Sequence, residues 1–220
     1  YASMLGDIQI QRGIGTSTNG DGAFGGSVSL SSKSVNPYPF AEFTLGAGVY
    51  GTSRIGASFS SGLFEDHWVV EGAFNRTATD GYIHGTAGSS GSWYCGISWT
   101  DSRFQARYRL IGNYENTGQA WNGIEIDGMN SYDEIWAAGL GRYNSLVESY
   151  EIGEDGSVTF KPYTYDGGNE WKRTTDNFTQ LHNILSFAYE PTDRLKTTLS
   201  LHDTYGYGWY DELKPNCKLS

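Results

Sequence analysis

Apolar and polar residues alternate along seven stretches of the chain. In the first, Ala41, Phe43 and Leu45 alternate with Glu42, Thr44 and a glycine. The same period of two recurs in six further stretches, at 55–63, 68–75, 93–99, 104–110, 181–189 and 195–201. Because successive side chains of a strand point to opposite faces of a sheet, this alternation predicts seven β-strands, each with one apolar and one polar face.

The connections between the predicted strands are short at one end and long at the other. Short turns contain Glu65, Asp101 and Pro191, whereas the opposite end carries a loop at about 79–90 and an excursion at about 116–177. Short turns on one side and long loops on the other are typical of outer-membrane barrels. A structureless loop as long as this excursion would be unusual in a compact soluble domain.

The excursion contains one predicted element of its own. Two alternating runs, 149–152 and 157–160, flank an Asp155-Gly156 dipeptide. Asp-Gly between two such runs is a strong signal for a tight turn, so the pattern predicts a β-hairpin inside the excursion.

Aromatic residues flank the short turns, at Tyr38, Phe40, Phe64, Trp68, Trp99, Phe104 and Tyr189. In an up-and-down meander all of them lie at one end of the sheet, where a barrel carries an aromatic girdle at the membrane interface. In a soluble sandwich the apolar face would instead be a core. We therefore expect an all-β fold, a partial antiparallel transmembrane β-barrel of about seven up-and-down strands.

Charge and composition limit the kinds of partner that the chain is expected to contact. The 220 residues include 15 Lys and Arg against 25 Asp and Glu, which gives a net charge of −10 and argues against nucleic acid as a partner. The chain lacks an apolar run of about 18 residues, but a barrel strand needs only about 9–11 alternating residues. Outer-membrane lipid is therefore the expected partner.

The two cysteines, Cys95 and Cys217, fit unpaired thiols better than a disulfide framework.

The sequence offers little support for catalysis or a resident metal. The four histidines are scattered without ligand spacing, and a G-x-S-x-G elbow is absent. A formal G-x-G-x-x-G at Gly20, Gly22 and Gly25 is followed by a strand pattern, not by the helix that dinucleotide binding requires. We expect neither enzyme activity nor a cofactor nor a metal site.

A separate pair of alternating runs precedes the seven strands. Ile8 and Ile10 alternate with polar residues, a glycine-rich segment follows, and alternation resumes at Val28 and Leu30. This pattern predicts two short strands joined by a compact turn region.

The same segment carries a family resemblance. The runs 9–13 (QIQRG), 15–20 (GTSTNG) and 22–28 (GAFGGSV) resemble the last part of the plug domain of TonB-dependent outer-membrane receptors, in the form common in Bacteroidetes. The segments 119–123 and 176–178 also resemble the third extracellular loop of these receptors. The plug ending departs from that of the starch-utilisation transporters, so glycan import is not what the resemblance implies.

The resemblance implies a division of the chain and a function. Residues 1–34 would be the C-terminal part of the plug, and 35–220 the N-terminal part of the receptor β-barrel, within a longer protein. The chain would lie in the outer membrane of a Gram-negative bacterium and import a scarce large ligand, such as a metal-siderophore, haem or cobalamin. The energy would come from the TonB complex of the inner membrane, through an N-terminal box that these residues do not include.

Two sets of residues are candidates for these roles. Ligand contacts are expected from the plug loop and the long extracellular loop, at Thr16, Thr18, Asn19, Asp21, Trp121, Tyr132 and Trp136. The tryptophans could equally pack the excursion against its own hairpin. The resemblance implies that Arg12 pairs with a barrel carboxylate and holds the plug, and Glu71 is the local candidate for that partner.

Two alternative functions remain open at this point. A passive porin-like channel would share the strand pattern but lack the plug segment. A soluble β-sandwich binding module would need a partner for each apolar face.

Overall fold

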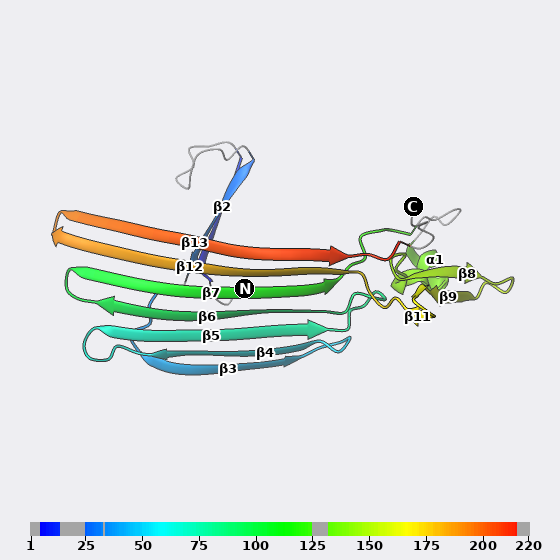
Figure 1. The fold of residues 1–220 in the computed structure, drawn as a ribbon, viewed down its shortest axis with the longest axis horizontal. Helices are drawn as coiled ribbons and strands as arrows, with labels where there is room; N and C mark the ends of the chain where they lie inside the picture. Colours follow the sequence, from blue (N-terminus) through cyan, green and yellow to red (C-terminus); the bar gives the residue numbers. More distant parts are fainter. Residues whose placement is uncertain (1–4, 14–24, 33, 125–131, 215–220) are drawn as a thin grey trace.

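The computed structural model describes residues 5–13, 25–32, 34–124 and 132–214, which form an all-β molecule with a small helical insertion (Figure 1). Its main element is one antiparallel sheet in the order β13-β12-β7-β6-β5-β4-β3. The strands are β3 (Pro39–Ala47), β4 (Ser53–Ser61), β5 (Trp68–Thr79), β6 (Gly88–Thr100), β7 (Phe104–Gly118), β12 (Thr175–Thr192) and β13 (Leu195–Asp211). Each strand pairs with its sequence neighbours within the sheet, so the predicted up-and-down meander of seven strands is confirmed.

The strands become longer along the chain, and several exceed their predicted bounds. β3 has 9 residues, whereas β12 has 18 and β13 has 17. The extensions of β6 and β12 consist mostly of glycine, serine and other polar residues, which weaken the alternation without preventing pairing. In the extension of β13, glycines alternate with Tyr205, Tyr207 and Trp209. A side chain at Gly208 would approach the Asn177 carbonyl oxygen to 2.5 Å, so glycine permits the close pairing of β12 and β13. β3 and β13 are the edge strands of an open sheet in the described residues.

The two faces of the sheet differ in exposure in an unusual way. The large apolar side chains are exposed, with Phe43 at 81% and Leu45 at 82% of their full accessible area. On the opposite face, Ser92 is only 1% exposed, and Ser60, Ser98 and Asn75 are also buried. A water-soluble sheet normally buries its apolar face, so this sheet shows the reverse arrangement.

Aromatic rings cluster on the apolar face beside the short turns. The Trp99 ring contacts those of His67 and Phe104, with centroids 5.3 and 5.6 Å apart. Phe104 continues the cluster to Phe187 at 6.2 Å and Tyr189 at 6.4 Å. A second group of Tyr205, Tyr207 and Trp209 follows β13 on the same face toward the opposite end, with successive centroids 6.1 Å apart.

The excursion connects β7 to β12 over 119–174 and lies at the end opposite the short turns (Figure 1). It contains α1 (Tyr132–Ala137), a 3-10 turn at Leu140–Arg142, β8 (Glu148–Ile152), β9 (Val158–Pro162), β10 (Thr164–Tyr165) and β11 (Asn169–Glu170). β8 pairs with β9, which confirms the predicted hairpin around Asp155-Gly156. The loop between β5 and β6 spans 80–87, shorter than predicted, because β6 begins at Gly88.

The two short strands near the N-terminus are also present. β1 (Leu5–Arg12) pairs with β2 (Gly26–Ser32) in an antiparallel register that matches Ile10 with Val28. They form a two-stranded sheet of their own, separate in pairing from the seven-stranded sheet. In the described ranges, no helix has the length and apolar character needed to cross a membrane.

Candidate functional site

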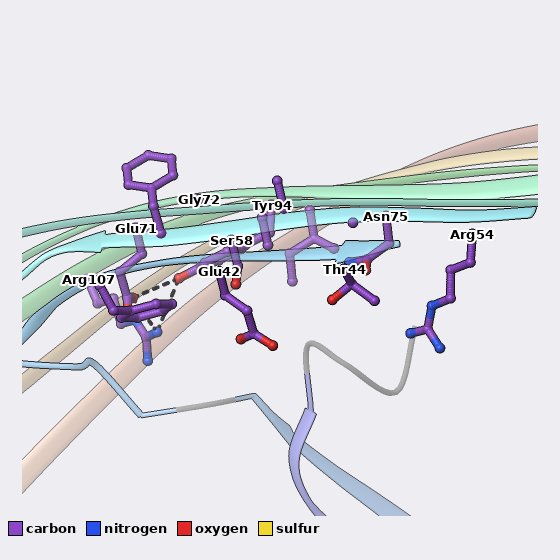
Figure 2. Close-up of a pocket in the computed structure, with 15 residues that line it drawn as sticks. Glu42, Thr44, Arg54, Ser58, Glu71, Gly72, Asn75, Tyr94 and Arg107 are labelled. Carbon is purple, nitrogen blue, oxygen red and sulfur yellow. Dashed lines mark hydrogen bonds and ion pairs between the residues drawn. The ribbon is translucent and has the colours of Figure 1, made fainter. Parts of the chain in front are cut away.

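A pocket of about 270 Å³ lies on the polar face of the sheet. Strands β3 to β7 all contribute side chains to it. Its polar lining residues are Glu42, Thr44, Arg54, Ser58, Glu71, Asn75, Tyr94 and Arg107 (Figure 2). The pocket therefore combines both signs of charge with hydroxyl and amide groups on one sheet face.

A hydrogen-bonded cluster forms one side of the pocket. Arg107 Nη2 donates to Glu71 Oε2 at 3.1 Å and to the Tyr94 hydroxyl oxygen at 3.1 Å. Tyr94 in turn donates to Glu71 Oε2 at 3.1 Å. The Asn36 backbone N–H donates to the other carboxylate oxygen, Oε1, at 3.2 Å. Both oxygens of Glu71 are therefore occupied.

This cluster is largely shielded from solvent. The side chains of Arg107 and Glu71 are 14% and 11% exposed. A buried ion pair adds little net stability, but removing one partner leaves an uncompensated charge and is strongly destabilising. The cluster therefore joins β5, β6 and β7 through side chains as well as through backbone pairing.

Strand register and two glycines create this arrangement. Glu71 lies opposite Gly96 on β6, two residues from Tyr94. A side chain at position 96 would meet the Tyr94 hydroxyl at 2.2 Å, so glycine leaves the space that the ring occupies beside Glu71. Gly56 on β4 has the same role for the Asn75 side chain, whose oxygen would lie 2.8 Å from an added carbon.

The other side of the pocket is more open. Glu42, Thr44 and Arg54 extend from β3 and β4 on the same side of the sheet (Figure 2). All three residues are exposed. Within the ranges that the structure describes, neither Glu42 nor Arg54 forms an ion pair. They leave one carboxylate and one guanidinium available to a polar ligand that enters the pocket.

The structure does not bring Arg12 to Glu71. Glu71 binds Arg107 instead, and Arg12 lies exposed on β1 with no ion pair among the described residues. In the structure the Glu71 carboxylate accepts hydrogen bonds from Arg107, Tyr94 and the Asn36 backbone. The role of Arg12 in holding a plug stays a prediction.

The candidate ligand residues are only partly covered by the structure. Thr16, Thr18, Asn19 and Asp21 lie outside the described residues, as does the side chain of Tyr132. Trp121 and Trp136 lie in the excursion, each about half exposed. Trp136 stacks on Tyr82 with centroids 5.9 Å apart and planes 8° apart, so one face of its ring packs against the loop between β5 and β6.

Of the residues that line the polar pocket, the sequence singled out Glu71 alone, as a candidate partner of Arg12 and not as part of a pocket. A signal for the pocket is present, because Arg107 and Arg109 lie two residues apart on the polar face of one strand. Alternation shows that they share a face, but it does not show which carboxylate lies across the sheet from them. Only the pairing of β5, β6 and β7 identifies Glu71 and Tyr94 as the partners of Arg107.

The arrangement of both charges, hydroxyls and an amide on one face suits the binding of a polar ligand. In the described part of the chain, no cluster of three or more His, Cys, Asp and Glu side chains is placed to hold a metal ion. Cys95 is a free cysteine on the apolar face of β6. Comparisons with protein-family models, curated proteins and solved structures found no match to this chain.

Proposed function

We propose that this chain is part of a transmembrane β-barrel in the outer membrane of a Gram-negative bacterium. The observation that carries the proposal is the reversed sheet, in which large apolar side chains are exposed while small polar side chains on the other face, such as Ser92 and Ser98, are buried. Each large apolar side chain moved from water into hydrocarbon stabilises the protein by about 1.5–3 kcal/mol. Lipid on this face therefore removes the largest unfavourable exposure, while the polar face lines a wet interior.

The spacing of the aromatic groups supports this proposal. Leu199 of β13 pairs with Phe187, beside the first aromatic cluster, and Tyr207 belongs to the second. At about 3.4 Å per residue, the strand between Leu199 and Tyr207 is roughly 27 Å long. A strand tilt of about 45° converts this length to a layer of roughly 20 Å, close to the apolar band of about 25 Å in known barrels.

Within this proposal, the function is active import of a scarce large ligand. The resemblance of 9–28 to a receptor plug supports it, with a metal-siderophore, haem or cobalamin as the ligand class and the TonB complex as the energy source. In this arrangement 1–34 belongs to the plug and the excursion to the extracellular loops. We propose no catalytic step.

A passive porin-like channel is the second candidate. The polar pocket supports a passive channel as much as it supports active import, because a water-filled lumen that contains Glu42 and Arg54 suits either function. A soluble β-sandwich is less well supported, since no other layer of the described residues covers the apolar face.

Cell fractionation and uptake measurements with the complete gene product test these functions. If the protein is an importer, it should be recovered in the outer-membrane fraction and should migrate differently in electrophoresis after heating. Ligand uptake should stop when the TonB complex is deleted. Uptake that continues in the deletion strain would assign a passive channel instead. Recovery of the protein in the soluble fraction would overturn the membrane proposal altogether.

A further inference from the structure

Two histidines that are far apart in the sequence lie together on the polar face of the β12–β13 hairpin. His182 pairs with Thr204, and Ile184 pairs with His202, so the histidines are diagonal neighbours across the two strands. Their imidazole centroids are 5.8 Å apart and their planes differ by 15°. The sequence conceals this proximity, because the hairpin turn lies between the two residues (Figure 1).

Both rings direct a nitrogen toward one oxygen. Thr204 Oγ1 lies 3.0 Å from Nδ1 of His182 and 2.9 Å from Nε2 of His202. A hydroxyl has one proton, so it donates to one ring and accepts a hydrogen bond from the other. The hydroxyl therefore marks a point at which two imidazole nitrogens converge.

We propose that His182 and His202 together bind a divalent transition-metal ion of the Cu²⁺, Ni²⁺ and Zn²⁺ class. Imidazole nitrogen suits all three ions. Rotation of the Thr204 side chain frees the convergence point, and the ion takes the place of the hydroxyl. Each nitrogen then moves by less than about 1 Å, from hydrogen-bonding distance to the metal–nitrogen distance of about 2.0–2.1 Å.

The surroundings make this an open, exchangeable site. Asp203 is next to His202 in the chain, but its side chain lies on the opposite face of the sheet. With two protein ligands, the remaining coordination positions go to water or to donor atoms that accompany the metal. Arg109 lies on the same face, opposite Ile184, and its positive charge opposes the binding of a cation.

The other two histidines provide a matched contrast. Nδ1 of His67 lies 2.8 Å from the Thr100 carbonyl oxygen, and Nδ1 of His84 lies 2.7 Å from Glu148 Oε1. Neither ring stacks on a second imidazole in the part of the chain that the structure describes. The His182–His202 pair is therefore the place where Cu²⁺ should find two imidazoles at once.

Titration of the protein with Cu²⁺ in detergent micelles, followed by electron paramagnetic resonance, tests the inference. The wild-type spectrum should show coupling to two imidazole nitrogens at one equivalent of Cu²⁺. We expect His182→Ala and His202→Ala each to weaken Cu²⁺ binding about 10-fold or more and to remove one nitrogen coupling. Loss of a residue that only hydrogen-bonds to a metal ligand already weakens metal binding by about 10-fold, and loss of the ligand itself should weaken it at least as much. His67→Ala should leave both the affinity and the couplings unchanged.

Thr204→Val separates metal binding from a structural role of the hydrogen bonds. It removes the competing hydroxyl, so Cu²⁺ affinity should stay the same or increase. Equal binding by wild type and the His182→Ala/His202→Ala double variant would overturn the inference, as would equal losses in Thr204→Val and the histidine variants. Circular dichroism verifies that each variant is folded. The measurement needs neither transport nor TonB, so its result is independent of the proposed function.

Discussion

The seven-stranded sheet and the excursion at 119–174 differ in where their large apolar side chains lie. On the sheet, Phe43 and Leu45 are exposed while serines of the other face are buried. In the excursion, Leu140 is 1% exposed, and Leu146 and Val147 are also buried. The excursion thus has a small apolar core of its own, whereas the large apolar side chains of the sheet point outward.

Polar groups in the excursion serve to attach it to the rest of the molecule. Asn144 is buried, and its Nδ2 donates to the carbonyl oxygens of His84 at 2.7 Å and Gln119 at 2.9 Å. Its Oδ1 accepts from the Leu146 N–H at 3.0 Å. The bond to His84 fastens the excursion to the loop between β5 and β6, and the bond to Gln119 ties it to its own first residue, directly after β7. The comparison teaches that one chain can combine a sheet with exposed apolar side chains and a segment with its own apolar core, joined by buried hydrogen bonds.

The largest expected effect concerns the buried charge of the sheet. Arg107→Ala removes the cation beside Glu71 and should destabilise the protein by about 3–5 kcal/mol, because the carboxylate stays buried without its counter-charge. Denaturant unfolding of the protein in detergent measures this change. The Arg107→Ala/Glu71→Ala double variant should lose less than the sum of the two single variants. Additive losses would mean that the two side chains do not interact.

A matched pair of apolar substitutions tests the contrast between the regions directly. Leu201 on the sheet and Ile152 in the excursion are each 52% exposed. In a bilayer, Leu201→Arg should cost about 2–4 kcal/mol, since arginine is unfavourable on a lipid-facing strand. Ile152→Arg should change stability by less than about 0.5 kcal/mol, as at an ordinary surface position. Folding in lipid vesicles is the measurement, and equal effects at the two positions would remove the distinction.

A second matched pair tests the boundary between the regions. Gly85 and Gly156 both have left-handed φ angles, +74° and +79°. A side chain at position 85 would also meet the Val147 methyl group at 2.8 Å, whereas position 156 has open space. We expect Gly85→Ala to lower the free energy of unfolding by about 1–3 kcal/mol through the contact with Val147, in addition to backbone strain. Gly156→Ala should lower it by about 1 kcal/mol through backbone strain alone. Hydrogen exchange of the excursion amides distinguishes them, and identical protection in both variants would contradict the close approach.

The smallest effect is a pH dependence confined to the hairpin. Asp155 accepts hydrogen bonds from the Ser157 hydroxyl at 2.6 Å and the Ser157 N–H at 3.0 Å. Both bonds hold the pKa of the Asp155 carboxyl below its usual range, and the bond from the Ser157 hydroxyl has the larger effect. Because the pKa of Asp155 is lower in the folded than in the unfolded protein, the ionised carboxylate stabilises the hairpin at pH values above the unfolded-state pKa. This stabilisation is lost as the pH falls through the folded-state pKa.

Asp155→Asn should therefore remove the change that the hairpin undergoes at pH below about 4. NMR of the β8 and β9 amides during acidification measures it, with Glu154→Gln as a control in the same turn. If wild type and Asp155→Asn respond identically to acid, the hydrogen bonds to Ser157 do not shift the titration.

Local pattern was sufficient to predict most of the fold. Alternation identified all seven strands of the sheet, and Asp155-Gly156 identified the hairpin of the excursion, because both signals depend on residues close in the chain. The ends of β6 and β12 were missed, because glycine and polar residues there extend a strand without an apolar signature. The end of β13 was missed although Tyr205, Tyr207 and Trp209 continue the alternation there. The exposed apolar face follows from the same alternation, although its contact with lipid rests on the proposal.

The site depended on contacts between residues distant in the sequence. Arg12 and Glu71 suit each other by charge, but the register of β5, β6 and β7 assigns Glu71 to Arg107 and Tyr94. Likewise, His182 and His202 have no ligand spacing, and only the β12–β13 pairing brings their rings together. The sequence by itself determined which residues share a face, since period and turn chemistry are local properties. The tertiary structure alone decided which side chains meet, since strand register and close approach are set by the whole sheet.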